Sequence, residues 1–448
     1  MLPTARAARL SIAAAWSALL LAAAMPAAAK LVVMHGYADY TSALVWIQAD
    51  SPGPVTVTWR AGDTDRQLTL VANPADDLVV VARLTGLAPG TSVAYRVAGD
   101  GDQRDGTVRT QRWWTRSDAP RDFVLAIGSC NFVHDGNPTW PDRGYGGGYE
   151  IFDAIAAKAP DAMLWLGDNL YYQQPDFLDP ASMAVRNRKQ RSHAPLQSLL
   201  TATAHVAIWD DHDFGPNDAD SSYVMKGETL KLFQRYWPNP SFGLPGVAGN
   251  FGWIRYGDID VFLLDDRWYR SANRAPDGPG KTMFGAPQIE WLKNALLHSQ
   301  APLKLIAGGN QFLNRANRFE GWNNFATEQK AFLEWLFAQR IDGVVFLSGD
   351  RHFSELLRVA RPGTYPLYEF TSSPLTSGPW DPPPQGEKEN PDVVPDTLVA
   401  KRQFGLIRIG GPGTARKVTL ESYDGAGALV WQHEIPFATL RTPRSGAQ

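Results

Sequence analysis

Two different hydrophobic patterns divide the chain near residue 119. Before that point, short β-type runs such as SALVWIQAD, VTVTWR and LVVVARL are separated by Gly, Pro, Asp and Asn. Short strands that alternate with turn residues are typical of an all-β sandwich. Residues 30–118 are therefore predicted to form an N-terminal β-sandwich domain.

From Asp122 onward, apolar runs alternate with segments of helical periodicity. The runs with the length of buried strands are FVLAIGSC (123–130), AMLWLGDN (162–169), HVAIWDDH (205–212), DVFLLDDR (260–267), LKLIAGGN (303–310) and GVVFLSGD (343–350). PQIEWLKNALLHSQ and TEQKAFLEWLFAQR have the spacing of amphipathic helices, and Thr327 is predicted to cap the second. This alternation predicts an α/β domain over residues 119–438. The late runs FGLIRIG and KVTLESYDGAGALVWQHEI are expected to add hairpin strands, and residues 439–448 to form a C-terminal tail.

The first 29 residues have the organisation of a secretory signal peptide. Arg6 and Arg9 precede a short Ala- and Leu-rich apolar stretch, which ends in Pro26 and three alanines. This order predicts cleavage before Lys30 and a periplasmic or secreted protein without a transmembrane span after cleavage. The alternative, an uncleaved membrane anchor, is disfavoured because the apolar stretch is short.

Charge and cysteine content narrow the function classes. The chain has 43 basic and 46 acidic residues, a formal net charge of -3, which gives no indication of a nucleic-acid partner. Cys130 is its one cysteine, so no disulfide can form within the chain. This cysteine is therefore inert, paired with another chain, or bound to a ligand.

Side chains that can bind metal ions stand at the end of each apolar run. They are Cys130, Asp168, Asp211 with His212, Asp265, Asn310 with Gln311, and Asp350 with His352. Ligands of open α/β sheets bind beyond the carboxyl ends of the strands, so these side chains are expected to converge on one crevice. Taken singly, each carboxylate could instead be a turn or cap residue, and the cysteine a small apolar one.

The densest of these groups is AIWDDHDFGPND (207–218), in which Asp210, Asp211 and Asp213 crowd around His212. Burying like charges this closely is costly unless a positive charge lies among them. One or two divalent or trivalent cations would provide that charge. Oxygen and imidazole ligands with one thiolate suit iron, manganese, calcium or zinc.

The motifs at these positions resemble those of a known family. GSCN, LWLGDNLYY, WDDHDFGPND, LLDDRWYR and FLSGDRHFSELLRV, followed by YEFTSSPLTSG, resemble in order and spacing the motifs of the PhoD-like alkaline phosphatases. This family is a branch of the calcineurin-like metallophosphoesterases, and the resemblance covers roughly residues 120–375. It implies an α/β (α+β) catalytic domain, a two-sheet αββα sandwich, preceded by an immunoglobulin- or fibronectin-like β-sandwich.

The resemblance also implies roles for individual residues. The implied metal ligands are Cys130, Asp168, Tyr171, Asp211, Asp350 and His352, and the implied catalytic residues are His212, Arg267 and His352. Asp168 would bridge two metals, Tyr171 would bind ferric iron, with Tyr172 as the alternative, and Arg267 would lie near the phosphate. The implied cofactors are two or more metal ions, Fe(III) with Ca(II), with Mn or Zn as alternatives.

The predicted function is hydrolysis of phosphomonoesters, and also of phosphodiesters, by in-line attack of a metal-bound hydroxide. The substrate would be a small-molecule or lipid phosphoester, with Trp268 and Tyr269 expected beside an organic leaving group. One alternative is a phospholipase D-type phosphodiesterase. Another is a non-catalytic metal-containing binding protein, which the presence of ligand-capable residues at every motif disfavours.

Overall fold

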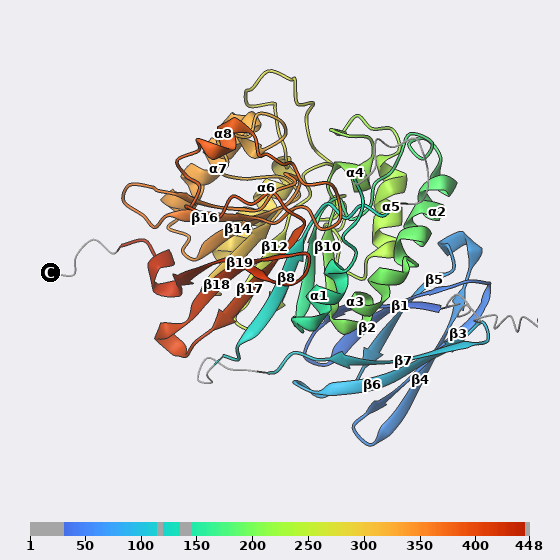
Figure 1. Cartoon of the computed structure of the whole chain (residues 1–448). Coiled ribbons are helices and arrows are strands. Elements are labelled where there is room, and N and C mark those ends of the chain that lie inside the picture. Colours follow the sequence, from blue (N-terminus) through green and yellow to red (C-terminus); the bar gives the residue numbers. More distant parts are fainter. Residues whose placement is uncertain (1–30, 114–119, 135–144, 444–448) are drawn as a thin grey trace, which may run out of the picture.

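The computed structural model describes residues 31–113, 120–134 and 145–443 (Figure 1). The predicted signal peptide and the last five residues of the predicted tail lie outside the described residues. Within the described ranges, no helix combines the length and apolar character needed to cross a bilayer.

The N-terminal domain is the predicted β-sandwich. One sheet has the order β1-β2-β5 and the other β4-β3-β6-β7, and neighbouring strands within both are antiparallel. The strands are β1 (Leu31–Ala38), β2 (Ser42–Ala49), β3 (Gly53–Ala61), β4 (Thr64–Ala72), β5 (Val79–Thr85), β6 (Ser92–Gly99) and β7 (Asp102–Arg109). Alternate apolar residues of the two sheets, such as Val45 and Val57, share one buried core.

The second domain contains two six-stranded sheets among the described residues, with the orders β10-β9-β8-β17-β18-β19 and β11-β12-β13-β14-β16-β15. The first comprises β8 (Phe123–Gly128), β9 (Ala162–Leu166), β10 (Ala204–Ile208), β17 (Gln403–Gly410), β18 (Lys417–Asp424) and β19 (Leu429–Pro436). The second comprises β11 (Gly252–Tyr256), β12 (Ile259–Leu263), β13 (Leu303–Ala307), β14 (Val344–Ser348), β15 (Glu355–Val359) and β16 (Leu367–Thr371). All six apolar runs predicted as buried strands are strands.

The two sheets pack face to face. Leu125 and Val206 of the first sheet share a buried core with Val261, Leu305 and Val345 of the second. The outer face of the first sheet is covered by α1 (Ile151–Ala157), α2 (Pro180–Arg191), α3 (Gln197–Ala202), α4 (Asp211–Phe214) and α5 (Lys226–Tyr236). The second sheet is covered by α6 (Ala286–His298) and α7 (Ala326–Ala338), and α8 (Gln385–Lys388) lies in a Pro-rich segment, residues 379–395. This layering is the predicted αββα sandwich.

The start of α7 differs from the prediction. A 3-10 helix, η3 (Trp322–Phe325), runs directly into α7, so Thr327 is the second residue of the helix and not its cap. The Asp277 carboxylate instead accepts hydrogen bonds from the backbone N (3.2 Å) and Oγ1 (2.7 Å) of Thr327. A distant acidic residue thus provides the acceptor that the prediction had assigned to the local threonine.

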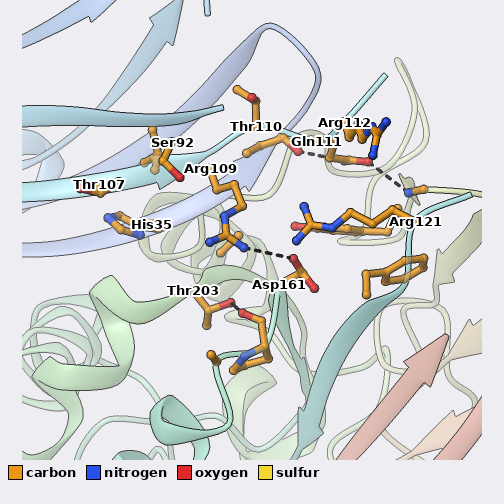
Figure 2. Close-up of a pocket in the computed structure, with 18 of the residues that line it drawn as sticks. His35, Ser92, Thr107, Arg109, Thr110, Gln111, Arg112, Arg121, Asp161 and Thr203 are labelled. Carbon is orange, nitrogen blue, oxygen red and sulfur yellow. Dashed lines mark hydrogen bonds and ion pairs between the residues drawn. The ribbon is translucent and has the colours of Figure 1, made fainter. Parts of the chain in front are cut away.

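The sandwich docks against the catalytic domain through β1, which contacts β10 and α3. Trp46 Nε1 donates to the carbonyl of Arg235 in α5 (2.8 Å), and Gln111 Nε2 donates to the carbonyl of Arg255 (2.9 Å). Figure 2 shows a pocket at this junction, where Arg109 faces Asp161 across the boundary at 3.9 Å. In Figure 1 the sandwich lies below α3, whereas α4 lies near the opposite end of β10. The sandwich therefore contacts the first sheet of the catalytic domain at the end of β10 opposite to α4.

Candidate metal centre

The carboxyl ends of four strands bring the predicted ligands together. Cys130 follows β8, Asp168 follows β9, α4 with His212 follows β10, and His352 follows β14. Ligand atoms of Cys130, Asp168 and His352 lie within 4.8 Å of one another. Those of Asp168, Asp211 and His212 form a second such group. Because Asp168 belongs to both groups, its carboxylate lies where one residue could contact two ions.

The backbone is strained at the ends of these strands. Cys130, Asp168, Asp350 and His352 have φ values of 57°, 52°, 66° and 55°. Asparagine, aspartate and histidine adopt left-handed backbone more readily than other non-glycine residues, so the strain is greatest at Cys130, where it costs on the order of 1 kcal/mol or more. Such strain concentrates at functional sites, where surrounding contacts hold the backbone in place. Here the Asn131 N–H donates to the Asp168 carbonyl at 2.7 Å and ties the β8 and β9 loops together.

Tyr171 faces the cluster and Tyr172 faces away from it. The Tyr171 hydroxyl donates to Asp168 Oδ2 at 3.1 Å, and its ring lies 4.2 Å from the His212 ring. The Tyr172 hydroxyl instead accepts a hydrogen bond from Asn187 Nδ2 in the core beneath α2 (2.8 Å). Of the two tyrosines considered from the sequence, Tyr171 is the one placed beside the predicted ligands.

His352 is oriented by a segment distant in the sequence. Its Nδ1 forms a 2.5 Å hydrogen bond with the Gly378 carbonyl, which selects the tautomer with the proton on Nδ1 and the lone pair on Nε2. This arrangement is typical of metal-bound imidazoles, whose other nitrogen donates to a carbonyl or carboxylate. Burial lowers the pKa of His352, which also favours the neutral imidazole. The Asp350 carboxylate, two positions earlier, acts to raise the pKa of both His352 and Cys130, but Asp350 does not belong to a group of three clustered ligand atoms.

The pKa values of the buried acidic groups indicate a site that favours a cation. Burial raises the pKa of Asp168 well above its usual value, and Asp211 and Cys130 raise it further. Burial raises the pKa of the Cys130 thiol to about 11, and the Asp350 carboxylate adds to the effect. A cation bound among these groups would stabilise the carboxylates and the thiolate and reverse both effects.

The three aspartates around His212 have three different partners. Asp210 Oδ1 accepts from Arg267 Nε at 2.6 Å. Asp213 accepts from the backbone N of Asn169 (3.0 Å) and of Asp210 (3.1 Å), so it joins the β9 loop to α4. Asp211 is the one placed in a ligand group with His212, whose pKa is lowered by burial. Of the three aspartates, Asp210 therefore forms an ion pair, Asp213 connects the β9 loop to α4, and Asp211 is the candidate metal ligand.

Arg267 lies in a buried ion-pair network. Its Nη1 and Nη2 donate to the two carboxylate oxygens of Glu320 at 2.8 and 3.0 Å, in addition to the bond with Asp210. Burial alone would lower the pKa of Arg267, but Asp210 and Glu320 raise it above its usual value. Its guanidinium, predicted to face a phosphate, is here occupied by carboxylates. A direct contact with phosphate stays a prediction.

Two candidate ligands were missed by the sequence reasoning. Asp218 and Glu320 form a third ligand group with Asp211, again within 4.8 Å. Burial raises the pKa of Asp218 to about 6, and Glu320 and Asp211 contribute to the shift. Asp218 is the last residue of the WDDHDFGPND motif (209–218). Glu320 lies in an irregular loop after β13, and no local pattern marks it.

Other polar residues at strand ends have structural partners. Asp265 accepts from Trp209 Nε1 at 2.7 Å and from three backbone N–H groups. Asn310 Nδ2 donates to Asp210 (2.9 Å), and Gln311 Nε2 donates to Glu355 (2.7 Å). These residues hold the loops in place and lie outside the three ligand groups.

The donor set fits metal ions of two kinds. Cys130, His212 and His352 offer sulfur and nitrogen, which suit borderline metals such as iron and zinc. Asp211, Asp218 and Glu320 offer only carboxylate oxygens, which harder cations such as Ca²⁺ prefer. The identity of the ions stays a prediction.

Comparison with known proteins agrees with this geometry. A family model described as PhoD-like phosphatase matches residues 125–409, and one described as Domain of unknown function (DUF7800) matches residues 31–111. No curated protein matches the sequence. The solved structure of PhoD is 18% identical, with a TM-score of 0.73, and the match covers 90% of this chain and 91% of that chain. Purple acid phosphatase PPD1 from yellow lupin (Lupinus luteus) seeds is 8% identical, with a TM-score of 0.62, over 91% of this chain and 74% of that chain.

At these identities the solved structures establish the fold alone, and they confirm the predicted fold class. The family model covers more than half of the chain and supports a metal-dependent phosphoesterase. The chain belongs to the PhoD-like phosphatase family.

Proposed function

We propose that this chain is an exported phosphoesterase that hydrolyses phosphomonoesters and phosphodiesters of small molecules, using Fe(III) together with Ca(II). The observation that carries the proposal is a chain of three ligand groups, of which the first and second share Asp168 and the second and third share Asp211. A buried cluster with this excess of acidic groups is built to hold cations. When bound, such ions supply Lewis acidity toward phosphoryl oxygens and lower the pKa of a coordinated water.

The residues of the chain have distinct tasks in this proposal. His352, fixed by Gly378, and His212, packed on Tyr171, present neutral imidazoles to the centre. Tyr171 is held through its hydroxyl by Asp168 and Ser377. The rigid placement of these groups favours stabilisation of developing charge without rearrangement during the reaction.

No serine nucleophile is assigned to the reaction. Ser129 is fully buried and its Oγ donates to the Ser372 carbonyl at 3.0 Å. Ser348 is fully buried and bonds with Thr371 Oγ1 (2.9 Å). Both hydroxyls serve contacts between strands, which favours direct attack by water on phosphorus.

The test uses the purified full chain with its metals, assayed on 4-nitrophenyl phosphate, on bis(4-nitrophenyl) phosphate and on phosphatidylcholine vesicles. Turnover of both aryl esters, abolished by a chelator and by Asp211→Asn, would support the proposal. Asp105→Asn, on the exposed face of the sandwich, is the matched control and should behave as wild type. Cleavage of the lipid headgroup alone would favour the phospholipase D alternative. A metal-loaded protein that turned over none of the three would be a binding protein.

Export is a separate part of the proposal and rests on residues 1–29. Expression of the full chain in a bacterium with two membranes should place a protein beginning at Lys30 in the periplasm or medium. N-terminal sequencing of the recovered protein provides the test. An intact N-terminus in the membrane fraction would favour the uncleaved anchor.

A further inference from the structure

Two aromatic side chains are exposed beside the metal centre. Phe319 is 54% exposed and Trp380 is 39% exposed, although most aromatic side chains in the described part of the chain are buried. Their ring centroids lie 5.6 Å apart at an interplanar angle of 58°. Leaving two large apolar rings in water is unfavourable, and exposed apolar pairs beside a polar centre are typical of ligand-binding surfaces.

The backbones of both aromatic residues adjoin residues of the centre. The backbone N of Trp380 donates to the His352 carbonyl at 2.9 Å, and the Gly378 carbonyl two residues earlier accepts from His352 Nδ1. Phe319 directly precedes Glu320, which lies in the ligand group with Asp211 and Asp218. The backbones of both residues thus adjoin the centre, and the rings themselves contact Arg351, whose Nη1 lies 3.8 Å from Asp350 Oδ2.

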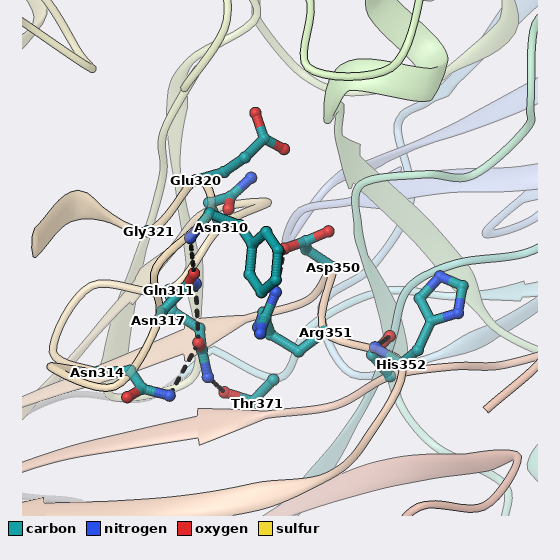
Figure 3. Close-up of polar contacts among 12 residues, drawn as sticks. Asn310, Gln311, Asn314, Asn317, Glu320, Gly321, Asp350, Arg351, His352 and Thr371 are labelled. Carbon is teal, nitrogen blue, oxygen red and sulfur yellow. Dashed lines mark hydrogen bonds and ion pairs between the residues drawn. The ribbon is translucent and has the colours of Figure 1, made fainter. Parts of the chain in front are cut away.

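Arg351 supports this pair of rings. Its guanidinium carbon lies 5.2 Å from the centroid of the Phe319 ring and 5.4 Å from that of Trp380. The side chain is 4% exposed and also pairs with Glu387 of α8 at 3.4 Å. Figure 3 shows the Arg351 side chain below Asp350, on the side of the loop that carries Glu320 and pointing away from His352. A cation packed against both rings restrains them without closing them off from solvent.

We propose that Phe319 and Trp380 form an aromatic platform that binds the leaving group of the substrate. The inference rests on the proposed function: a phosphoryl group held at the metal centre directs its leaving group outward, toward the rim on which these rings lie. The substrate class is then an organic phosphoester whose leaving group carries a flat ring, such as a nucleoside. Stacking of a flat ring on an aromatic side chain is favourable for any base and does not depend on its hydrogen-bonding edge.

This assignment differs from the residues expected from the sequence. Trp268 packs on the core beneath α5, with the Lys226 ammonium 4.8 Å from its ring centroid. The Tyr269 hydroxyl donates to the Ala248 carbonyl at 2.9 Å. Neither contact is with a predicted ligand or its neighbour, whereas the Trp380 ring packs against Arg351, which stands between Asp350 and His352 in the sequence.

The experiment compares thymidine 5′-phosphate with glycerol 3-phosphate on the metal-loaded full chain. Both have a primary alkoxide leaving group, so they differ chiefly in the ring. Trp380→Ala and Phe319→Ala are each expected to lower kcat/KM for the nucleotide by roughly threefold to tenfold, with little change for glycerol 3-phosphate. Trp380→Phe should recover most of the loss. Trp113→Ala and Phe337→Ala, which remove exposed rings elsewhere, are the matched controls.

Binding of phenylphosphonate and methylphosphonate, measured by calorimetry on the same variants, tests the platform without turnover. Weaker binding of phenylphosphonate alone in Trp380→Ala would support it. An equal effect on both phosphonates, or on both esters, would overturn it, and so would no effect on either. If the wild type bound the phosphonates with the expected selectivity but hydrolysed no ester, the proposed function would fail and the platform would stand.

Discussion

Replacing Arg267 with methionine should destabilise the protein strongly. The side chain is fully buried, and its guanidinium neutralises Asp210 and Glu320, which are themselves buried. Methionine keeps the apolar volume but removes the charge and all the donors. Two buried carboxylates would then lack their main cation, because the Asn310 amide is a neutral partner of Asp210.

The expected loss can be estimated from the burial of the pair. Breaking a buried ion pair by removing one partner costs about 3–5 kcal/mol, because it leaves an uncompensated buried charge. Arg270 lies 3.4 Å from Glu320 and compensates part of the loss at that carboxylate, so the lower end of the range is expected. Adding Glu320→Gln should recover part of the loss, since one of the two unpaired charges is then removed.

The assay is urea unfolding of the chelator-treated protein, followed by tryptophan fluorescence, so that no cation bound at Glu320 replaces the lost guanidinium. Arg96→Met serves as the control, because its pair with Asp105 on the sandwich is exposed on both sides and should matter little. A loss for Arg267→Met of less than about 1 kcal/mol would refute the reasoning, since that is the range of surface ion pairs. Such a result, with a large rise in KM, would favour the direct phosphate contact predicted from the sequence.

Three further predictions address the centre and the sandwich. His352→Ala should lower kcat/KM at least about a hundredfold by removing an imidazole from the centre; wild-type metal content with more than about a tenth of wild-type kcat/KM, a loss under about 1.4 kcal/mol, would contradict its assignment. Purified wild type should be coloured by charge transfer from Cys130 and Tyr171 to Fe(III), and Cys130→Ser should change or abolish the band; a colourless, active, iron-free protein would exclude this ligation. Burial lowers the pKa of His35 from 6.5 to about 4, so the folded state binds fewer protons than the unfolded state between these values. Wild type should therefore lose up to about 3 kcal/mol of stability as pH falls from 6.5 to 4. His35→Gln should show a shallower decline in its urea midpoint, and parallel curves would refute the assignment.

The ligands after strands could be predicted because their positions follow from the hydrophobic pattern. Apolar runs mark buried strands, and the carboxyl ends of neighbouring parallel strands meet at one edge. Cys130, Asp168 and His212 were found in this way and follow the adjacent strands β8, β9 and β10. His352 comes from the second sheet; it was predicted from its place after the apolar run GVVFLSGD, and the resemblance of FLSGDRHFSELLRV to a family motif supported the prediction.

What the sequence could not predict depends on contacts between distant loops. Arg267 and Glu320 are separated by 53 positions, and neither lies in a regular element. No local sequence pattern shows that Glu320 would pair with Arg267. The only partner predicted for Arg267 was therefore the phosphate, which the family resemblance implied. Thr327 was assigned a local capping role for the same reason, because its real acceptor, Asp277, is 50 residues away. Irregular backbone carries no periodicity, and its contacts appear only when the sheets are assembled.

The most direct test of the metal centre is elemental analysis combined with kinetics on wild type and Asp168→Asn. Asp168 contributes to two of the three ligand groups, and its amide analogue keeps the shape while losing the charge. Wild type should contain about two ions per chain and hydrolyse 4-nitrophenyl phosphate. Asp168→Asn should lose metal and at least about a hundredfold in kcat/KM. Full metal content in Asp168→Asn with kcat/KM within about tenfold of wild type would contradict the central claim that this buried cluster is the catalytic metal site.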